Sequence, residues 1–386
     1  MGKSNKIYMD YAASVLPNPG SIHAFGESAK VKLEAARTKV AGVLGARTDE
    51  IIFTSGGTES NNLAIQGTAW AFLSSQAVLG KNKKILPHII TTNIEHPSVL
   101  ETCRMLRDRG LAEISIVSVE SNGIVNAKEI KKEIKKNTAL VSVMYANNEI
   151  GTIQPIRELS REIRHYRKTN SSYYPLFHTD AVQAVNYLDL KKDNLGADLI
   201  SLSGSKIENA GRVGVLLKRN SVTILPLFGG GDQEGKLRPG TENLASIIKF
   251  SNALESAQKE RVKEGKRLTL LRNYFLKKLL KSEKNILVNG DIDMRLPNNL
   301  NISLINIPSD LMVIELSSKG IMASSKSACK SSGAEGSYVI RAIRPEQDPQ
   351  IGGVRFSLGR ETTKQDIDHA VKALSQILNK LKKWYY

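Results

Sequence analysis

A single lysine stands in a short polar turn between two apolar runs of the chain. Residues 199–202 are apolar, the small residues of "SGS" (203–205) follow, Lys206 comes next, and a second apolar run covers 213–217. The pattern predicts two buried strands with Lys206 at the end of the first. We expect this lysine to be buried and therefore neutralised or paired. A lysine with a lowered pKa is the nucleophile that carbonyl and Schiff-base chemistry needs.

Other polar side chains follow further predicted strands: His96, Asn148, Asp180 and Gln183. Each has a structural reading when taken alone. An isolated histidine is more often structural than catalytic, and an aspartate at a strand end can simply cap the next helix. Because ligands of open α/β sheets bind beyond the carboxyl ends of the strands, we expect these residues to meet Lys206 at one site.

A glycine-rich turn, "TSGGTE" (54–59), lies between a predicted strand and a predicted helix. Gly57 lets the backbone approach a ligand, and the helix that begins near Thr58 offers free N–H groups to an anion. The turn lacks the lysine of a P-loop and the spacing of a dinucleotide fingerprint. It therefore indicates a small phosphate rather than a nucleotide.

Together these groups suit pyridoxal phosphate. This cofactor needs an anion cradle, a lysine for its aldehyde and a carboxylate for its pyridinium nitrogen. Each element alone is ambiguous, but their joint occurrence at strand ends is much more specific.

The composition is that of an ordinary globular protein. The chain has 386 residues, is 41% hydrophobic and 24% charged, and carries a net charge of +17. The positive charge permits attraction to nucleic acid or acidic partners, but many lysines lie on helix-like segments such as 127–136 and 271–284, so we expect solvated faces instead. The sequence has no apolar run long enough for a membrane span and no leader peptide, which predicts a cytoplasmic protein.

Strands and helices alternate through most of the chain, which predicts an α/β domain with a largely parallel sheet followed by a smaller α+β domain. The predicted strands cover 50–55, 88–93, 113–119, 139–146, 175–180, 198–204 and 213–217. Helical patterns cover 58–73, 127–136, 155–168 and 243–282, and another begins at Ser98. Towards the C-terminus come apolar segments at 299–305, 320–325 and 353–358, and helices near 309–319, near 335–343 and from Thr363.

The sequence resembles the cysteine desulfurase family, in the class V branch of the aspartate-aminotransferase fold, over nearly its whole length. The matching stretches include "FTSGGTESNNLAIQG", "EHPSVLETC", "FHTDAVQA", "GGGDQEGKLRPGTEN", "SSKSACKSS" and "VRFSLGRETT", in the family's order. The resemblance implies the pyridoxal-phosphate-dependent fold type I, with a mainly parallel seven-stranded sheet. It divides the chain into a large cofactor-binding domain at 15–258 and a small domain made of 1–14 and 259–386.

The resemblance also assigns roles to residues. Lys206 would hold pyridoxal phosphate covalently, Asp180 would pair with its ring nitrogen, and His96 would stack on the ring and shuttle protons. The other implied cofactor contacts are Gly57, Thr58, Asn148, Gln183, Ser203, Ser205 and, from the neighbouring subunit of a homodimer, Thr241. Arg355 would clamp the substrate carboxylate with two parallel hydrogen bonds, aided by Asn148.

The two cysteines have different settings. Cys103 lies in the apolar helical run "VLETCRML", which predicts a core residue. Cys329 lies among small and polar residues between Lys326 and Lys330, whose charge favours the thiolate. By the resemblance, Cys329 attacks the sulfur of cysteine, yielding alanine and a persulfide. The sulfur would pass to an acceptor such as an iron–sulfur scaffold or a tRNA-thiolation enzyme, as in the long-loop group of the family.

The chain departs from the family at several positions. Ser205 stands where the family has a phosphate-binding histidine, "ENAGRVG" (208–214) replaces the usual glycine-proline-lysine run, and Lys326 replaces a glycine. Two alternatives therefore stay open beside the desulfurase: a selenocysteine lyase or other class V lyase, and a degenerate scaffold that binds no cofactor. Two isolated cysteines provide no disulfide framework and no cysteine-rich metal site.

Overall fold

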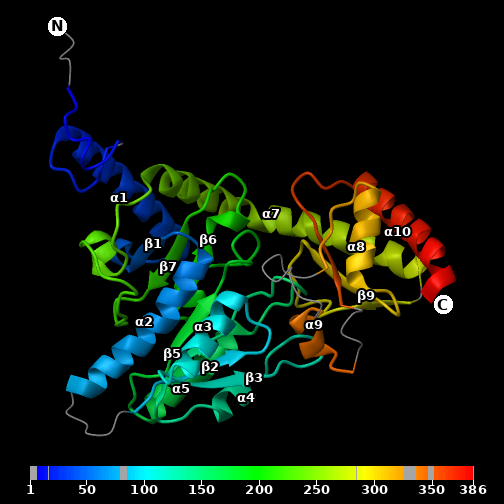
Figure 1. The fold of residues 1–386 in the computed structure, drawn as a ribbon, viewed down its shortest axis with the longest axis horizontal. Helices are drawn as coiled ribbons and strands as arrows, with labels where there is room; N and C mark the ends of the chain where they lie inside the picture. Colours follow the sequence, from blue (N-terminus) through cyan, green and yellow to red (C-terminus); the bar gives the residue numbers. More distant parts are fainter. Residues whose placement is uncertain are drawn as a thin grey trace.

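The computed structural model describes residues 7–15, 17–78, 85–283, 285–325, 336–346 and 352–385. Cys329, Lys326 and Lys330 lie outside these residues. Within the described part the fold has a large sheet of seven strands, a second sheet of three strands, and helices around both. Figure 1 shows the large sheet on the side of the N-terminus and the small sheet on the side of the C-terminus.

The large sheet has the strand order β1-β7-β6-β5-β4-β2-β3. Its strands are β1 Ile51–Thr54, β2 His88–Thr92, β3 Glu113–Val117, β4 Thr138–Ser142, β5 Leu176–Asp180, β6 Leu199–Ser203 and β7 Gly214–Lys218. Only β7 runs against its neighbours, pairing antiparallel with β1 and β6. The prediction of a largely parallel sheet is therefore confirmed.

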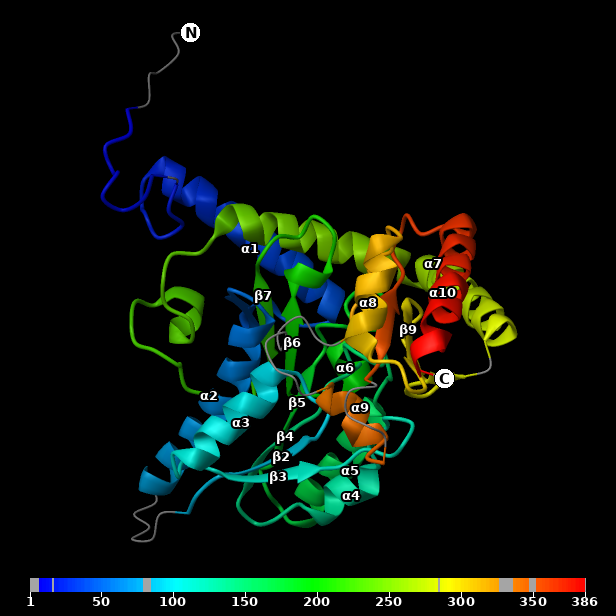
Figure 2. The ribbon, with the colours of Figure 1, turned by 45° about the vertical axis from the view of Figure 1, so that its right-hand side comes forward.

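Alternate residues of the strands in the large sheet face two separate cores, as the period of two in a strand requires. Ile51 and Phe53 belong to one core with residues of helices α1, α4, α5 and α7, whereas Ile52 belongs to the other with residues of α2 and α3. Helices thus cover both faces of the sheet, which explains why its strands read as nearly continuous apolar runs. Figure 2 shows α2 and α3 packed on the near face.

The helices are α1 Ala24–Leu44, α2 Gly57–Val78, α3 Pro97–Asp108, α4 Ala127–Lys132, α5 Ile156–Thr169, α6 Lys192–Leu195, α7 Leu244–Ser282, α8 Ser309–Ser318, α9 Tyr338–Ile343 and α10 Lys364–Tyr385. Short 3-10 turns occur at Thr48–Glu50, Gly204–Lys206 and Gln233–Lys236. The sequence analysis predicts most of these helices, but it predicts neither helix α1 nor the short strand β8 of the second sheet.

The second sheet is antiparallel, in the order β10-β9-β8, and packs against α8, α10 and the C-terminal half of α7 in a core of its own. Its strands are β8 Ile286–Val288, β9 Asn299–Leu304 and β10 Val354–Ser357. The predicted apolar segment 320–325 makes only one bridge, between Ser324 and Arg355. Helix α7 passes unbroken from one core to the other (Figure 1), so the predicted domain boundary at 258 lies inside a helix and stays a prediction.

Candidate active site

A cavity of about 470 Å³ opens at the carboxyl ends of the parallel strands. The predicted site residues that line it are Gly57, Thr58, His96, Asn148, Asp180, Gln183, Ser203, Ser205, Lys206 and Arg355. They come from segments up to roughly 300 residues apart in sequence, and the sheet brings them together because its parallel strands end at one edge. Thr241 does not line the cavity and is exposed in this chain.

Lys206 is exposed rather than buried, so the expectation of a buried lysine is wrong. Strand β6 ends at Ser203, and the 3-10 turn Gly204–Lys206 carries the chain out of the sheet before the lysine is reached. Within the described part of the chain, the Nζ atom makes no hydrogen bond or ion pair that would hold it elsewhere. The amine is therefore placed to react with a group in the cavity.

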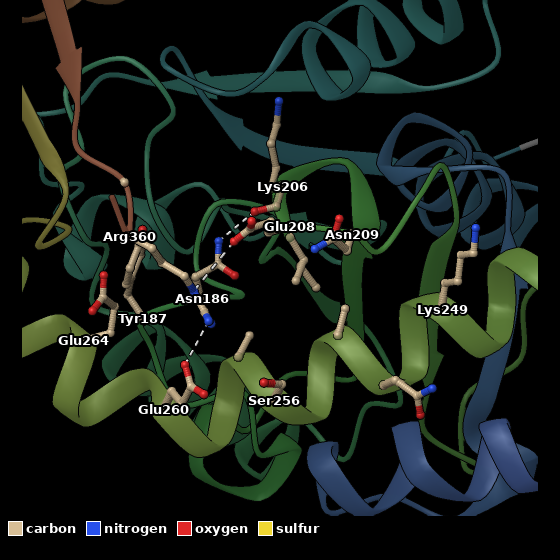
Figure 3. A pocket seen from close by; sticks show the side chains of 15 residues that line it. Asn186, Tyr187, Lys206, Glu208, Asn209, Lys249, Ser256, Glu260, Glu264 and Arg360 are labelled. Carbon is tan, nitrogen blue, oxygen red and sulfur yellow. Dashed lines mark hydrogen bonds and ion pairs between the residues drawn. The ribbon is translucent and has the colours of Figure 1, made fainter. Parts of the chain in front are cut away.

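A second cavity, of about 490 Å³, lies on the other side of the Lys206 turn. Figure 3 shows it between this turn and helix α7, with the Lys206 amine pointing away from it. The Asn186 side chain donates a hydrogen bond of 2.6 Å to the carbonyl oxygen of Lys206, and Arg360 pairs with Glu260 at 2.9 Å. The Asn186 contact supports the turn from the side of the second cavity and leaves the Lys206 amine to the first cavity.

Asp180 ends strand β5 and is buried, with only 5% of its surface exposed. Its Oδ1 accepts a hydrogen bond of 2.9 Å from the backbone N–H of Val182, and its Oδ2 accepts one of 2.7 Å from the Asn61 side chain. Two residues earlier, burial lowers the pKa of His178 to about 3, so this histidine is neutral and is held between the hydroxyls of Ser142 and Ser201. Asp180 therefore stands at this strand end with both oxygens held by hydrogen bonds.

His96 follows strand β2 and caps helix α3 through its Nδ1 atom. Burial is the main cause that lowers the pKa of His96; Asp180 opposes this effect and Lys206 adds to it. The neighbouring Glu95 is fully buried, and burial raises its pKa to about 8. Its backbone carbonyl accepts a hydrogen bond of 2.6 Å from Tyr338, which ties helix α9 to this part of the site.

The N-terminus of α2 and the end of β6 form a cradle of small residues. A Cβ atom on Gly57 would lie 2.8 Å from Val182 Cγ2 and 3.3 Å from the Cβ of Ser203, so only glycine leaves this space open. The hydroxyls of Ser203 and Ser205 lie 3.0 Å apart, beside the first turn of the helix. Hydroxyl groups and free N–H groups at a helix N-terminus are the donors that a phosphate group requires.

Arg355 and Asn148 also line the cavity, and Arg355 Nη1 donates a hydrogen bond of 2.7 Å to the backbone carbonyl of Asn148. Arg355 Nε and Asn148 Oδ1 are buried and have no hydrogen-bond partner within the described part of the chain. The same holds for Oδ1 of Asn298, which also lines the cavity. Because buried polar atoms are normally paired, these atoms indicate a polar ligand at this end of the cavity.

Several cavity residues are missed by the sequence analysis: Asn61, Ser98, Met144, Ala146, Val182, Asn186, Tyr187, Asn298 and Ser357. Asn61 and Ser98 lie inside stretches quoted above, close to Gly57 and His96, so their proximity in sequence is a usable signal. Nothing comparable marks Asn298. Among the described residues, no group of three or more histidine, cysteine, aspartate or glutamate side chains is arranged to hold a metal ion.

The predicted core position of Cys103 is confirmed. The thiol is fully buried, and burial raises its pKa to about 12, which keeps it protonated near neutral pH.

Among the residues that the structure describes, no helix combines the length and the apolar character needed to cross a membrane.

Comparison with known proteins agrees with this geometry. The profile of the aminotransferase class-V family matches residues 1–370. The cysteine desulfurase IscS of Dictyoglomus turgidum is 42% identical, over 98% of this chain and 95% of its own. That of Methanosarcina thermophila is 40% identical, over 97% of this chain and 88% of its own.

Among solved structures, a NifS-like protein of 34% sequence identity superposes with a TM-score of 0.83, covering 94% of this chain and 92% of its own. Family profile, sequence relatives and fold thus agree over nearly the whole chain. The chain therefore belongs to the aminotransferase class-V family and, within it, to the pyridoxal-phosphate-dependent cysteine desulfurases of the IscS type.

Proposed function

We propose that this cysteine desulfurase uses L-cysteine as its substrate, transfers the sulfur to Cys329 as a persulfide, and delivers it to an acceptor protein for iron–sulfur cluster assembly or tRNA thiolation. The observation that carries the proposal is the convergence of Lys206, Asp180, His96 and Arg355 on one cavity. An amine, a carboxylate, an imidazole and a guanidinium are the groups that amino-acid chemistry on this cofactor requires.

The residues present fit pyridoxal phosphate. The cradle at Gly57, Ser203 and Ser205 matches a phosphate, Asp180 offers a carboxylate to the ring nitrogen, and Lys206 offers its amine to the aldehyde. When bound, the cofactor supplies an electron sink for the substrate's Cα carbanion. Ser205 replaces a histidine in the phosphate cradle and can still donate a hydrogen bond, although without a charge.

The remaining residues would act on the substrate. The Arg355 guanidinium would receive the substrate carboxylate, and its bond to the Asn148 carbonyl fixes its position. Asn148 would contribute its side-chain amide to the same end of the cavity, and Gln183 would donate to the cofactor's ring oxygen. His96, whose ring lines the cavity close to Asp180, would move protons.

Replacing Arg355 with lysine is expected to raise the KM for L-cysteine about 10- to 100-fold while kcat falls less. Lysine keeps the positive charge but loses the planar fork that holds a carboxylate with two bonds. Steady-state kinetics of alanine formation check this expectation. Arg360→Lys is the matched control, because Arg360 pairs with Glu260 at the second cavity; an equal rise in KM in both variants would argue against the assignment.

The proposal assigns the sulfur to Cys329 because the chain offers only one other thiol. The sequence has two cysteines, and Cys103 is buried and protonated. In the transfer, the Cβ–S bond of the substrate breaks and an S–S bond forms on the Cys329 sulfur. L-cysteine and one thiol thus give alanine and one persulfide, with no added oxidant.

We further propose a cytoplasmic location, because a free reactive thiol persists in a reducing compartment.

We also propose a homodimer. Large apolar side chains are exposed along the N-terminal segment, which extends away from the large sheet (Figure 1), and at one position of a later loop: Ile7, Met9, Tyr11, Val15, Ile22, Val31 and Phe228. Extended apolar surface of this kind marks a protein interface. A second copy of the chain would cover it and would bring its own Thr241 to the phosphate.

A mixed dimer tests the role of Thr241 across the interface. One chain carries Lys206→Ala and the other Thr241→Ala. If Thr241 acts across the interface, one site of the mixed dimer is fully native and binds pyridoxal phosphate with native affinity. If it acts within its own chain, the chain that keeps Lys206 has lost its own Thr241. The affinity of that site for pyridoxal phosphate then falls about 10-fold, the loss expected for one charge-assisted hydrogen bond. Sedimentation of the native protein as a monomer would rule the proposal out.

The substrate assignment is tested by comparing L-cysteine with L-selenocysteine. Purified protein is supplied with pyridoxal phosphate and a thiol reductant, and alanine formation is followed for each substrate. We expect alanine from L-cysteine, with sulfide in equal amount. Alanine from L-selenocysteine alone would identify a selenocysteine lyase, and a colourless protein that forms no alanine would identify a scaffold.

A further inference from the structure

The hydrogen bonds around His96 define which ring nitrogen carries the proton. The backbone N–H of Ser98 donates to His96 Nδ1 over 3.1 Å, as part of the N-terminal cap of helix α3. A backbone N–H can only donate, so Nδ1 must keep its lone pair. In the neutral ring the hydrogen is therefore on Nε2.

The Ser98 hydroxyl continues the same pattern. Its Oγ lies 2.8 Å from His96 Nδ1. Because Nδ1 accepts, the hydroxyl hydrogen must point towards it. The lone pairs of Oγ are then available, and one of them accepts a hydrogen bond of 2.8 Å from Nδ2 of Asn61.

Asn61 joins this chain of hydrogen bonds to Asp180. The second hydrogen on Nδ2 is donated to Asp180 Oδ2 over 2.7 Å. Turning the amide around would place its oxygen against the carboxylate, which is repulsive, so the amide orientation follows from this contact. Asn61, Ser98 and Asp180 are all more than nine-tenths buried, so these bonds are shielded from water.

We propose that Asn61 and Ser98 are positioning residues that hold His96 as its Nε2–H tautomer and fix its orientation relative to Asp180. In this network both oxygens of Asp180 accept hydrogen bonds, and Nδ1 of His96 keeps its lone pair, so the ring is neutral. A doubly protonated ring would place a hydrogen on Nδ1 against the N–H of Ser98. The charged side chains that face His96 are Asp180, at the end of β5, and Lys206, after β6.

The tautomer determines whether His96 donates or accepts a hydrogen bond in the cavity. His96 meets the contents of the cavity as a hydrogen-bond donor through Nε2. It can take up a proton at Nδ1 only after both the hydroxyl and the backbone N–H of Ser98 have moved away from that atom. This consequence deepens the role proposed above for His96 and rests on that proposal. The tautomer itself does not, because it is a property of the protein alone and can be measured without substrate.

The test is nitrogen NMR on the full-length protein labelled with ¹⁵N-histidine, with and without added pyridoxal phosphate. The sequence has six histidines, and a His96→Gln variant assigns the His96 signals. We expect a protonated Nε2 and an unprotonated Nδ1 at neutral pH. The acid dissociation constant of His96 should fall about five-fold in Ser98→Ala, the effect of losing one ordinary hydrogen bond to the neutral ring. It should fall in the same direction but by less in Asn61→Leu, which removes the hydrogen bond that holds the Ser98 hydroxyl in place.

Two further variants separate positioning from a general structural effect. Ser98→Thr keeps the hydroxyl and should restore the native dissociation constant. Asn62→Leu changes the adjacent residue, whose side chain contacts Thr58, Gln66 and Thr102 instead of the network, and should leave the constant unchanged. A native protein with the proton on Nδ1, or folded Ser98→Ala and Asn61→Leu variants with the native constant, would overturn the proposal whether or not the protein desulfurates cysteine.

Discussion

Replacing Lys206 with alanine is expected to lower the rate of alanine formation from L-cysteine by about 10⁴-fold, a loss typical of removing a covalent catalytic group. The lysine is the only predicted site residue with a primary amine, the group that condenses with an aldehyde to a Schiff base. The variant should also lose the absorption band of lysine-bound pyridoxal phosphate, since Lys206 is the only lysine among the described residues that line this cavity.

Lys249→Ala is the matched control for this variant. Lys249 is an exposed lysine on α7 at the second cavity, on the far side of the Lys206 turn (Figure 3). It should keep native turnover and the native absorption band. Turnover near the native rate in Lys206→Ala would refute the assignment of the cofactor lysine, whatever the behaviour of the control.

Replacing Cys329 with alanine is the second change with a very large expected effect. Transfer of sulfur to the protein should disappear, with a loss of at least about 10³-fold in sulfide production, because no other thiolate is available. Cofactor binding should stay native, since the predicted contacts of the cofactor do not include Cys329. Mass spectrometry for the added sulfur atom and the cofactor absorption band together check both expectations.

Cys103→Ala separates the two thiols. Burial keeps the Cys103 sulfur protonated and out of contact with solvent, so its loss should affect stability rather than sulfur transfer. The small cavity left in the core, between α3 and its neighbours, should cost about 1 kcal/mol. Loss of sulfur transfer in Cys103→Ala with retention in Cys329→Ala would reverse the assignment.

Strand positions could be predicted because the central strands are covered on both faces and read as apolar runs. Strand β4 shows the limit of this signal, because it ends at Ser142 although the apolar run continues to 146. After Ser142 the backbone N–H groups of Val143 and Tyr145 still donate to carbonyls of β5, but the N–H of Met144 donates to the Glu95 side chain. At this end of β4 a backbone N–H therefore pairs with a side chain 49 residues away instead of with strand β2, which no local pattern reveals.

Helix α1 was missed for a different reason. Its buried face consists largely of small residues, including Ala29, Ala36 and Ala41, so the apolar stripe is weak. Its N-cap is His23, which is not among the residues that usually mark a helix start. Only Gly45, in the left-handed conformation at the C-terminus, is an ordinary boundary signal.

The site residues that sequence reasoning found lie next to strand ends or in family-like motifs. Some of those it missed are close in sequence to residues that it found, but their roles depend on long-range packing. Asn61 acts through Asp180, 119 residues further along, and Asn298 comes from the loop before β9. The exposure of Lys206 was mispredicted because burial of a strand does not extend through the turn that follows it.

The central claim is that sulfur passes from L-cysteine to Cys329, and a single-turnover measurement tests it most directly. Protein loaded with pyridoxal phosphate is mixed with less than one equivalent of L-cysteine, without reductant, and quenched. Alanine is then quantified, and the peptide that contains Cys329 is examined by mass spectrometry. We predict one alanine for each Cys329 that has gained a sulfur atom. Alanine accompanied by free sulfide, with Cys329 unmodified, would contradict the account.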